Sequence, residues 1–263
     1  MSQTAASPSL PTIAFIGGGN MASAIIGGLI HQGHPASQIE VVEPWAEARE
    51  ALRKNYGIEA QAEAGPALQR AQIVVWAVKP QTFKDAAAQA KAHTQGALHL
   101  SVAAGIRSDS IAQWLGTERI VRTMPNTPAL VGKGMSALYA RPAVSAPERQ
   151  SIEAIMATTG ELLWVDSEPQ LDAVTALSGS GPAYVFYFLE AMTRAGTGMG
   201  LTEQQAHQLA VGTFVGASEL ARRSDDPPSV LRQRVTSKGG TTYAALQSME
   251  AAGVAASFEA AMR

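Results

Sequence analysis

The sequence contains no cysteine among its 263 residues. This absence excludes disulfide bonds, a thiolate nucleophile and cysteine-based zinc sites, and it fits a reducing cytoplasm as the compartment. No run of about 18 consecutive apolar residues occurs, so no membrane-spanning helix is expected. We therefore expect a cytoplasmic protein that does not associate with membranes.

Charge is also scarce, because 16% of the residues are charged and the formal net charge is −2. A chain so close to neutral has no basic field that would attract nucleic acid or an anionic membrane. The five histidines show no metal-ligand spacing with carboxylates, so we expect no metal site. No Ser–His–Asp set or pair of catalytic carboxylates stands out, so a cofactor is expected to supply the chemistry.

Short apolar runs alternate with longer amphipathic segments from residue 11 to about residue 166. Such alternation predicts a Rossmann-type α/β domain with a mostly parallel sheet covered on both faces. Residues 1–10 are small and polar, and we expect a flexible tail there. The predicted strands span residues 13–16, 40–42, 73–78, 98–102, 120–123, 135–139 and 162–165, and the predicted helices here span residues 21–32 and 46–56.

The pattern changes after residue 166, where helical spacing persists and no convincing strand remains. We therefore expect a boundary near residue 166 and an all-α second domain over residues 167–263. Two domains also suit the length of the chain. The predicted helices of the second domain span residues 171–177, 182–195, 203–223, 229–234 and 242–251.

A glycine-rich turn joins the first predicted strand to the first predicted helix. Residues 17–22 fit the G-x-G-x-x-A pattern of dinucleotide-binding proteins. In that pattern Gly17 permits the tight turn, Gly19 lets the backbone approach a pyrophosphate, and Ala22 allows close packing of helix and strand. A purely structural turn is the alternative, but the strand before it and the helix behind it favour dinucleotide binding.

An acidic residue, Glu43, closes the second predicted strand. A carboxylate at this place can accept hydrogen bonds from the adenosine ribose of NADH, and it would repel the 2′-phosphate of NADPH. Arg49 lies nearby in the sequence and could contact that phosphate instead. The sequence therefore leaves both NADPH and NADH open as the cofactor.

Two more predicted strands end in segments that suit a ligand crevice. In a doubly wound sheet, the carboxyl ends of the strands line the site. Residues 77–80 close the third predicted strand, and small residues at 102–105 follow the fourth, leaving room for a flat ring or a ribose. Lys79 is also compatible with an ordinary surface lysine, but its place at a central strand end favours a functional role.

Two segments rich in serine, glycine and threonine interrupt the helical region, at residues 175–182 and 235–242. Each precedes a helix, where backbone amides gather and can hold a carboxylate. Helix capping alone would also account for hydroxyl residues at such places. Two such turns in a chain with a dinucleotide motif favour a substrate site.

Six segments, taken in order, resemble the pyrroline-5-carboxylate reductase family. The last two are specific to that family and the first is generic, and the similarity runs from residue 13 to about residue 253. The segments are residues 15–21 (FIGGGNM), 77–80 (AVKP), 101–105 (SVAAG), 122–129 (RTMPNTPA), 176–185 (ALSGSGPAYV) and 235–242 (VTSKGGTT).

The resemblance implies reduction of Δ1-pyrroline-5-carboxylate to L-proline, the last step of proline biosynthesis, with NADPH or NADH. It also implies that the helical domain interlocks with that of a second chain, giving a homodimer and often a homodecamer. Thr242 is the implied catalytic residue, with its hydroxyl near the imine nitrogen. Together with Glu43, the expected cofactor contacts are Gly17, Gly18, Gly19, Asn20, Met21, Ala22, Ala77, Val78, Lys79, Pro80, Val102, Ala103 and Ala104. The expected substrate contacts are Glu168, Thr175, Ser237, Gly240, Thr241 and Thr242.

Three positions depart from the family pattern. Ala64 and Arg234 stand where asparagines often contact the cofactor, and Lys238 stands where proline is common. The chain also ends at Arg263, earlier than is usual, which implies a shortened last helix.

Two other functions stay open at this point. A β-hydroxyacid dehydrogenase would share the domain organisation, but it needs a lysine on the helix after a glycine-rich turn, and residues 178–195 contain none. The other is a nucleotide-sensing binding module without turnover. The second turn favours a true substrate pocket over such a module.

Overall fold

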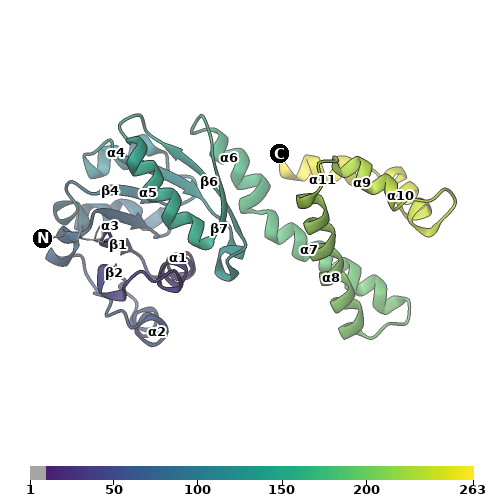
Figure 1. Ribbon diagram of the computed structural model, residues 1–263, viewed down its shortest axis with the longest axis horizontal. Helices are drawn as coiled ribbons and strands as arrows, with labels where there is room; N and C mark the ends of the chain where they lie inside the picture. Colours follow the sequence, from purple (N-terminus) through teal and green to yellow (C-terminus); the bar gives the residue numbers. More distant parts are fainter. Residues whose placement is uncertain (1–9) are drawn as a thin grey trace, which may run out of the picture. The chain divides into compact units, whose positions relative to one another are not determined.

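A computed structural model describes residues 10–263 of the chain (Figure 1). The chain forms two compact units, an N-terminal unit that ends at Ser180 and a C-terminal unit, Gly181–Arg263. The tail expected at residues 1–10 lies outside the described residues, apart from Leu10.

One seven-stranded sheet forms the centre of the N-terminal unit, in the order β2-β1-β3-β4-β5-β6-β7. Every neighbouring pair is parallel except β5 and β6, which are antiparallel. The prediction of a mostly parallel Rossmann-type sheet is therefore confirmed. The strands are β1 (Ile13–Ile16), β2 (Ile39–Val42), β3 (Ile73–Trp76), β4 (Leu98–Ser101), β5 (Ile120–Met124), β6 (Gly134–Ala140) and β7 (Gly160–Trp164).

Helices cover both faces of this sheet. Alternate residues of β1 point to opposite sides, as the pleat requires, so that Ile13 and Phe15 join one hydrophobic cluster while Ala14 and Ile16 join another. The first cluster includes residues of α1, α2 and α5, and the second includes residues of α3 and α4. These helices are α1 (Asn20–His31), α2 (Ala46–Tyr56), α3 (Phe83–Ala90), α4 (Ser108–Leu115) and α5 (Ala146–Met156).

The N-terminal unit continues beyond its last strand. A short helix, α6 (Gln170–Val174), leads into a wide helical turn at Thr175–Gly179, in which the Ser180 N–H donates to the Thr175 carbonyl oxygen at 2.8 Å. The boundary predicted near residue 166 coincides with the end of the strands, whereas the compact unit extends to Ser180.

The C-terminal unit is entirely helical. Helices α7 and α8 pack closely where both carry small residues, since a Cβ atom added at Gly196 would lie 2.8 Å from the Cβ atom of Ala206. The rings of Tyr184 and Phe188 on α7 meet Phe258 on α11 edge to face. The helices are α7 (Gly181–Gly198), α8 (Glu203–Arg223), α9 (Pro228–Arg234), α10 (Thr241–Ala251) and α11 (Val254–Met262). The sequence predicted no bounds for α11.

Among residues 10–263, no helix combines the length and the apolar character needed to cross a bilayer.

Candidate active site

The four segments predicted to bind a cofactor lie at one edge of the sheet. Strands β2, β1, β3 and β4 are neighbours and parallel, and their last residues stand side by side in register. These last residues are Val42, Ile16, Trp76 and Ser101. The residues that follow them are Glu43, Gly17, Ala77 and Val102. Backbone hydrogen bonds, such as the one from the Ala77 N–H to the Ile16 carbonyl oxygen at 2.8 Å, join the segments beyond the strand ends.

The connections also run in opposite directions at this point, because β2 lies on one side of β1 and β3 lies on the other. Such a switch in strand order opens a crevice at the carboxyl ends of the strands, which is where open α/β sheets bind nucleotides.

The glycine turn has the space that a pyrophosphate needs. Gly17 has a φ of +100°, and a Cβ atom there would lie 2.5 Å from the Ala77 carbonyl oxygen. A Cβ atom on Gly18 would lie 2.7 Å from a methyl group of Leu52, whereas one on Gly19 would meet no atom within 4 Å. Helix α1 begins after Gly19 without a side-chain cap, so its first amides can donate to a ligand. The turn therefore fits a dinucleotide.

Glu43 is buried beneath this turn. One carboxylate oxygen accepts a hydrogen bond from the Gly18 N–H at 2.7 Å, and the other accepts one from the Trp45 N–H at 2.9 Å. One guanidinium nitrogen of Arg49 donates to the backbone carbonyl oxygens of Glu43 and Pro44, at 2.9 and 2.7 Å. At the end of β2, therefore, the Glu43 side chain contacts the glycine turn, whereas the Arg49 side chain contacts the backbone of residues 43 and 44.

The remaining cofactor candidates complete this edge. Ala103 is buried and its N–H donates to the Ser101 hydroxyl at 3.3 Å, which fixes the small-residue loop after β4. Lys79 is exposed, and its carbonyl oxygen accepts from the N–H of Thr82 in the turn that precedes α3. The Lys79 side chain is therefore available at the crevice edge.

The predicted substrate turn belongs to the C-terminal unit. Between Ser237 and Gly240 the chain makes a tight turn, in which the Gly240 N–H donates to the Ser237 carbonyl oxygen at 3.0 Å and Gly239 has a φ of +76°. Helix α10 starts at Thr241 with no side-chain cap, so its first amides and the exposed hydroxyl of Thr242 can meet a ligand. Arg234, which departs from the family pattern, pairs with Asp226 at 2.7 Å.

The other two substrate candidates lie in the N-terminal unit. The Thr175 hydroxyl donates to the Leu171 carbonyl oxygen at 2.7 Å. The Glu168 carboxylate accepts from the Ser108 N–H at 2.5 Å, from the Ser108 hydroxyl at 2.8 Å and from the Arg122 guanidinium at 2.6 Å. Burial alone would raise the pKa of Glu168, but these three donors together hold that pKa below its ordinary value.

Sequence reasoning missed the roles of two residues in the 122–129 segment. The side chain of Asn126 joins two chain segments, because its amide donates to the Ser178 carbonyl oxygen at 3.0 Å and its oxygen accepts from the Met135 N–H at 2.9 Å. Arg122 is buried and pairs with Glu168. The signals in the sequence are an arginine within a mostly apolar strand and an asparagine just after that strand.

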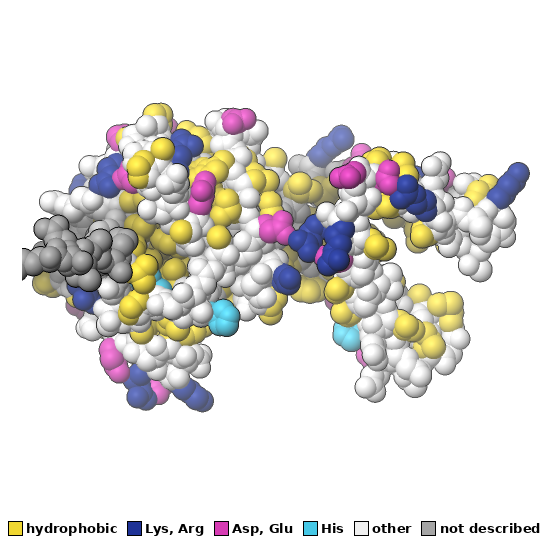
Figure 2. All heavy atoms as spheres, in the orientation of Figure 1, with side chains coloured by type: hydrophobic (Ala, Val, Ile, Leu, Met, Phe, Trp, Pro, Cys, Tyr) yellow, Lys and Arg dark blue, Asp and Glu magenta, His cyan; other side chains and the backbone are white. Residues whose placement is uncertain are grey.

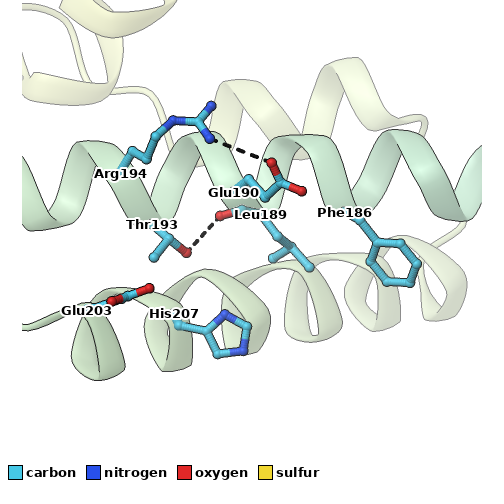
Figure 3. A pocket seen from close by; sticks show the side chains of 7 residues that line it. All are labelled: Phe186, Leu189, Glu190, Thr193, Arg194, Glu203 and His207. Carbon is cyan, nitrogen blue, oxygen red and sulfur yellow. Dashed lines mark hydrogen bonds and ion pairs between the residues drawn. The ribbon is translucent and has the colours of Figure 1, made fainter.

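Among the described residues, no cluster of three or more His, Cys, Asp or Glu side chains is arranged to hold a metal ion. A pocket of about 360 Å³ lies between α7 and α8 (Figure 3). Its polar side chains are partly engaged with one another, since Arg194 pairs with Glu190 at 3.6 Å and the Thr193 hydroxyl donates to the Leu189 carbonyl oxygen. None of the predicted substrate residues lines it; the lining residues are Phe186, Leu189, Glu190, Thr193, Arg194, Glu203 and His207.

The sheet, its switch point and the open glycine turn define a dinucleotide-binding protein of the Rossmann class. Two family descriptions match the chain: an NADP oxidoreductase, coenzyme F420-dependent, over residues 12–105, and a pyrroline-5-carboxylate reductase dimerisation domain over residues 168–263. The second match makes the C-terminal unit a self-association domain.

Relatives of the whole chain carry the same family name. The pyrroline-5-carboxylate reductase of Pseudomonas aeruginosa is 46% identical over 97% of this chain and 94% of its own length, and that of Haemophilus influenzae is 41% identical over 95% and 93%. The solved pyrroline-5-carboxylate reductase of Coxiella burnetii superposes with a TM-score of 0.89 at 36% identity, covering 96% of this chain and 94% of that one. The chain belongs to the pyrroline-5-carboxylate reductase family.

A further solved structure bears on the cofactor. The pyrroline carboxylate reductase of Plasmodium falciparum, solved with NADP bound, has a TM-score of 0.86 and 27% identity, covering 96% of this chain and 94% of that one. The family resemblance inferred from the sequence motifs is therefore confirmed, and NAD(P)H is the cofactor class.

Proposed function

We propose that this chain reduces Δ1-pyrroline-5-carboxylate to L-proline with NADPH or NADH. The observation that supports this most directly is the register of four parallel strand ends around an open glycine turn, in a chain 46% identical to a reductase of this name. Bound NAD(P)H supplies the hydride. The chain's own residues have to hold the dinucleotide, orient the imine and control its proton.

On the cofactor side, we assign binding to Gly17–Ala22, Ala77–Pro80 and Val102–Ala104. The open surface at Gly19 and the first amides of α1 suit the pyrophosphate, whose negative charge also meets the positive end of the helix. Ala103 and Ala104 keep side-chain bulk away from the crevice after β4.

On the substrate side, we assign the ring carboxylate to the amides of the Ser237–Thr242 turn. Gly239 has a positive φ and ends the turn just before α10. The N–H groups of Thr241 and Thr242 are in the first turn of α10 and have no acceptor within the helix, so they are free to bind a carboxylate. We propose that the N–H of the protonated imine donates to the hydroxyl oxygen of Thr242, which orients the ring and holds that proton. A protonated imine accepts hydride at carbon without further acid catalysis.

Glu168 takes a different part in this proposal. Its carboxylate already has three donors from Ser108 and Arg122. We therefore propose that it holds the start of α6 against the sheet, and that Thr175 supports the turn that follows.

The activity test uses the purified full-length chain with NADH or NADPH and pyrroline-5-carboxylate. The fall in absorbance of the reduced nicotinamide and the appearance of proline measure turnover. We expect oxidation that requires the imine. Turnover of β-hydroxyacids in its place would favour the dehydrogenase alternative. Dinucleotide binding without turnover of either substrate class would favour a sensing module.

For the assembly, we propose a homodimer formed through residues 168–263, with a homodecamer as the larger form that the family resemblance implies. Exposed apolar side chains on α7 and α8 support association of the helical units. We also propose a cytoplasmic location, which the absence of cysteine supports.

A further inference from the structure

The end of β2 is the part of the site that distinguishes the two dinucleotides. NADPH differs from NADH by a phosphate on the adenosine ribose, and in Rossmann-type sheets this ribose lies beside the residue that follows the second strand. In this chain that residue is Glu43, and its carboxylate lies 2.7 Å from the Gly18 N–H of the glycine turn. The acid is thus within the crevice and does not extend into solvent.

The carboxylate keeps capacity for a ligand. Each of its oxygens accepts one backbone N–H, from Gly18 and from Trp45. A carboxylate offers about four acceptor positions, so two remain for the ribose hydroxyls. A 2′-phosphate offers only oxygens in return and would add negative charge beside a carboxylate that burial keeps in place.

The nearby cation does not compensate. Arg49 donates from one guanidinium nitrogen, Nη1, to the carbonyl oxygens of both Glu43 and Pro44, so that this part of the cation is committed to the backbone of the strand end. The next basic residue of α2, Arg53, pairs with Glu50 through two hydrogen bonds.

We infer that Glu43 makes this enzyme selective for NADH, with the carboxylate receiving the adenosine ribose hydroxyls and repelling a 2′-phosphate. This inference rests on the proposed function only in requiring that a dinucleotide binds at the glycine turn. It departs from the NADP found in the structure of the Plasmodium falciparum relative.

The test is calorimetric titration of the full-length chain with NADH and with NADPH, without substrate. We expect NADH to bind roughly tenfold or more tightly, the scale of one unfavourable charge contact. In Glu43→Gln the ratio of the two dissociation constants should shift toward NADPH by a similar factor. Glu47→Gln, the matched control at an exposed residue of α2, should keep the wild-type ratio, and so should Arg49→Gln.

A second measurement needs no substitution. Added salt screens repulsion, so the preference of the wild-type chain for NADH should narrow as ionic strength rises. A phosphate held by Arg49 would instead make the relative affinity for NADPH fall with salt. Three results would overturn the inference and leave the proposed function intact. They are equal or tighter binding of NADPH by the wild-type chain, an unchanged ratio of dissociation constants in a folded Glu43→Gln variant, and a relative affinity for NADPH that falls with salt. Failure of both dinucleotides to bind would overturn the proposed function as well.

Discussion

The chemistry proposed for Thr242 depends on one hydroxyl group. In the proposed site the substrate carboxylate has several amide donors in the Ser237–Thr242 turn, so the loss of one side chain should leave its binding largely intact. The imine nitrogen, in contrast, has a single assigned hydrogen-bond partner, the Thr242 hydroxyl. The side chain and the backbone of the turn therefore have separable effects on kcat and KM.

We predict that Thr242→Ala lowers kcat by about 100-fold, the effect of losing one transition-state hydrogen bond worth about 3 kcal/mol, while KM changes little. Steady-state kinetics with the imine measure both constants. Thr242→Ser should retain most of the activity because it keeps the hydroxyl. Thr213→Ala is the matched control, because that hydroxyl only donates to the Leu209 carbonyl oxygen within α8. A wild-type kcat in Thr242→Ala would remove the residue from the mechanism.

His99 is a second residue whose chemistry has a measurable consequence. It lies buried on β4, where its Nδ1 atom accepts a hydrogen bond from the indole N–H of Trp76 at 3.0 Å. Burial, and to a lesser extent the charge of Arg119, lower the pKa of His99 from 6.5 to about 4. Between these two pH values the unfolded chain binds a proton that the folded chain does not, so stability must fall as the pH falls through this range.

We predict that this single group removes about 3 kcal/mol from the free energy of unfolding between pH 6.5 and pH 4. Urea unfolding at a series of pH values measures the slope. His99→Gln, which keeps an acceptor for Trp76 but does not titrate, should flatten it. His31→Gln, at an exposed histidine of α1, should reproduce the wild-type slope. Identical slopes in wild type and His99→Gln would contradict the assignment.

At the scale of helices and strands, local signals predicted the elements that local interactions define. Helices α2 and α8 have the predicted bounds. Helix α8 starts with a capping box, in which the Gln205 N–H donates to the Thr202 hydroxyl, and α2 ends where Gly57 adopts a φ of 68°. Both signals lie within a few residues of the helix end, so they can be read from the sequence.

Elements that depend on distant contacts could not be predicted in this way. The antiparallel direction of β6 leaves no mark in its own residue pattern. The wide turn at Thr175–Gly179 is fixed by Asn126, which binds the Ser178 carbonyl oxygen, and by Met124, whose methyl group would lie 2.6 Å from a Cβ atom at Gly179. The meeting of the predicted cofactor segments at one edge of the sheet could be predicted, because the carboxyl ends of parallel strands lie together. The pairing of Glu168 with Arg122 could not, because the two residues are far apart in the sequence.

The ion pair between Glu168 and Arg122 leads to a prediction about the stability of the N-terminal unit near α6. Removal of one partner of a buried ion pair leaves the other charge unsatisfied, so Glu168→Ala should lower the free energy of unfolding of the N-terminal unit by about 3 kcal/mol at neutral pH. Because the pKa of Glu168 is held below its ordinary value, this stabilisation is complete above that ordinary value and is lost as the pH falls through the lower one. The difference between wild type and variant should therefore narrow under acid conditions.

Asp172→Ala provides the control, since Asp172 forms an exposed pair with Arg107 at 2.6 Å and should contribute less than about 1 kcal/mol. Chemical denaturation with a probe in the N-terminal unit measures both variants. A Glu168→Ala protein of wild-type stability with a strongly raised KM would instead make Glu168 a direct substrate ligand.

At the scale of the whole molecule, the two units differ in how well they bury their apolar residues. The sheet has two hydrophobic clusters, whereas in the C-terminal unit only Gly196, Ala206 and Ala210 are buried among the described residues. Large apolar side chains lie on its surface instead, including Phe186 on α7 and Leu209 on α8. Figure 2 shows hydrophobic side chains, in yellow, on the surface of this unit. An apolar surface of this kind indicates a contact with another chain, in agreement with the dimerisation domain matched over residues 168–263.

We predict that the wild-type chain sediments as a dimer or a larger multiple at micromolar concentration. Phe186 is 58% exposed and lines the pocket between α7 and α8 (Figure 3), so we expect a partner chain to cover it. Phe186→Glu should weaken association roughly 30-fold or more, because it replaces a central aromatic contact with a charge that must be desolvated. Leu10→Glu introduces the same charge at a similarly exposed apolar residue of the N-terminal unit, and it should leave the sedimentation mass of the assembly unchanged. A monomeric wild type, or a Phe186→Glu chain that associates as tightly as wild type, would show that this pocket does not face a second subunit.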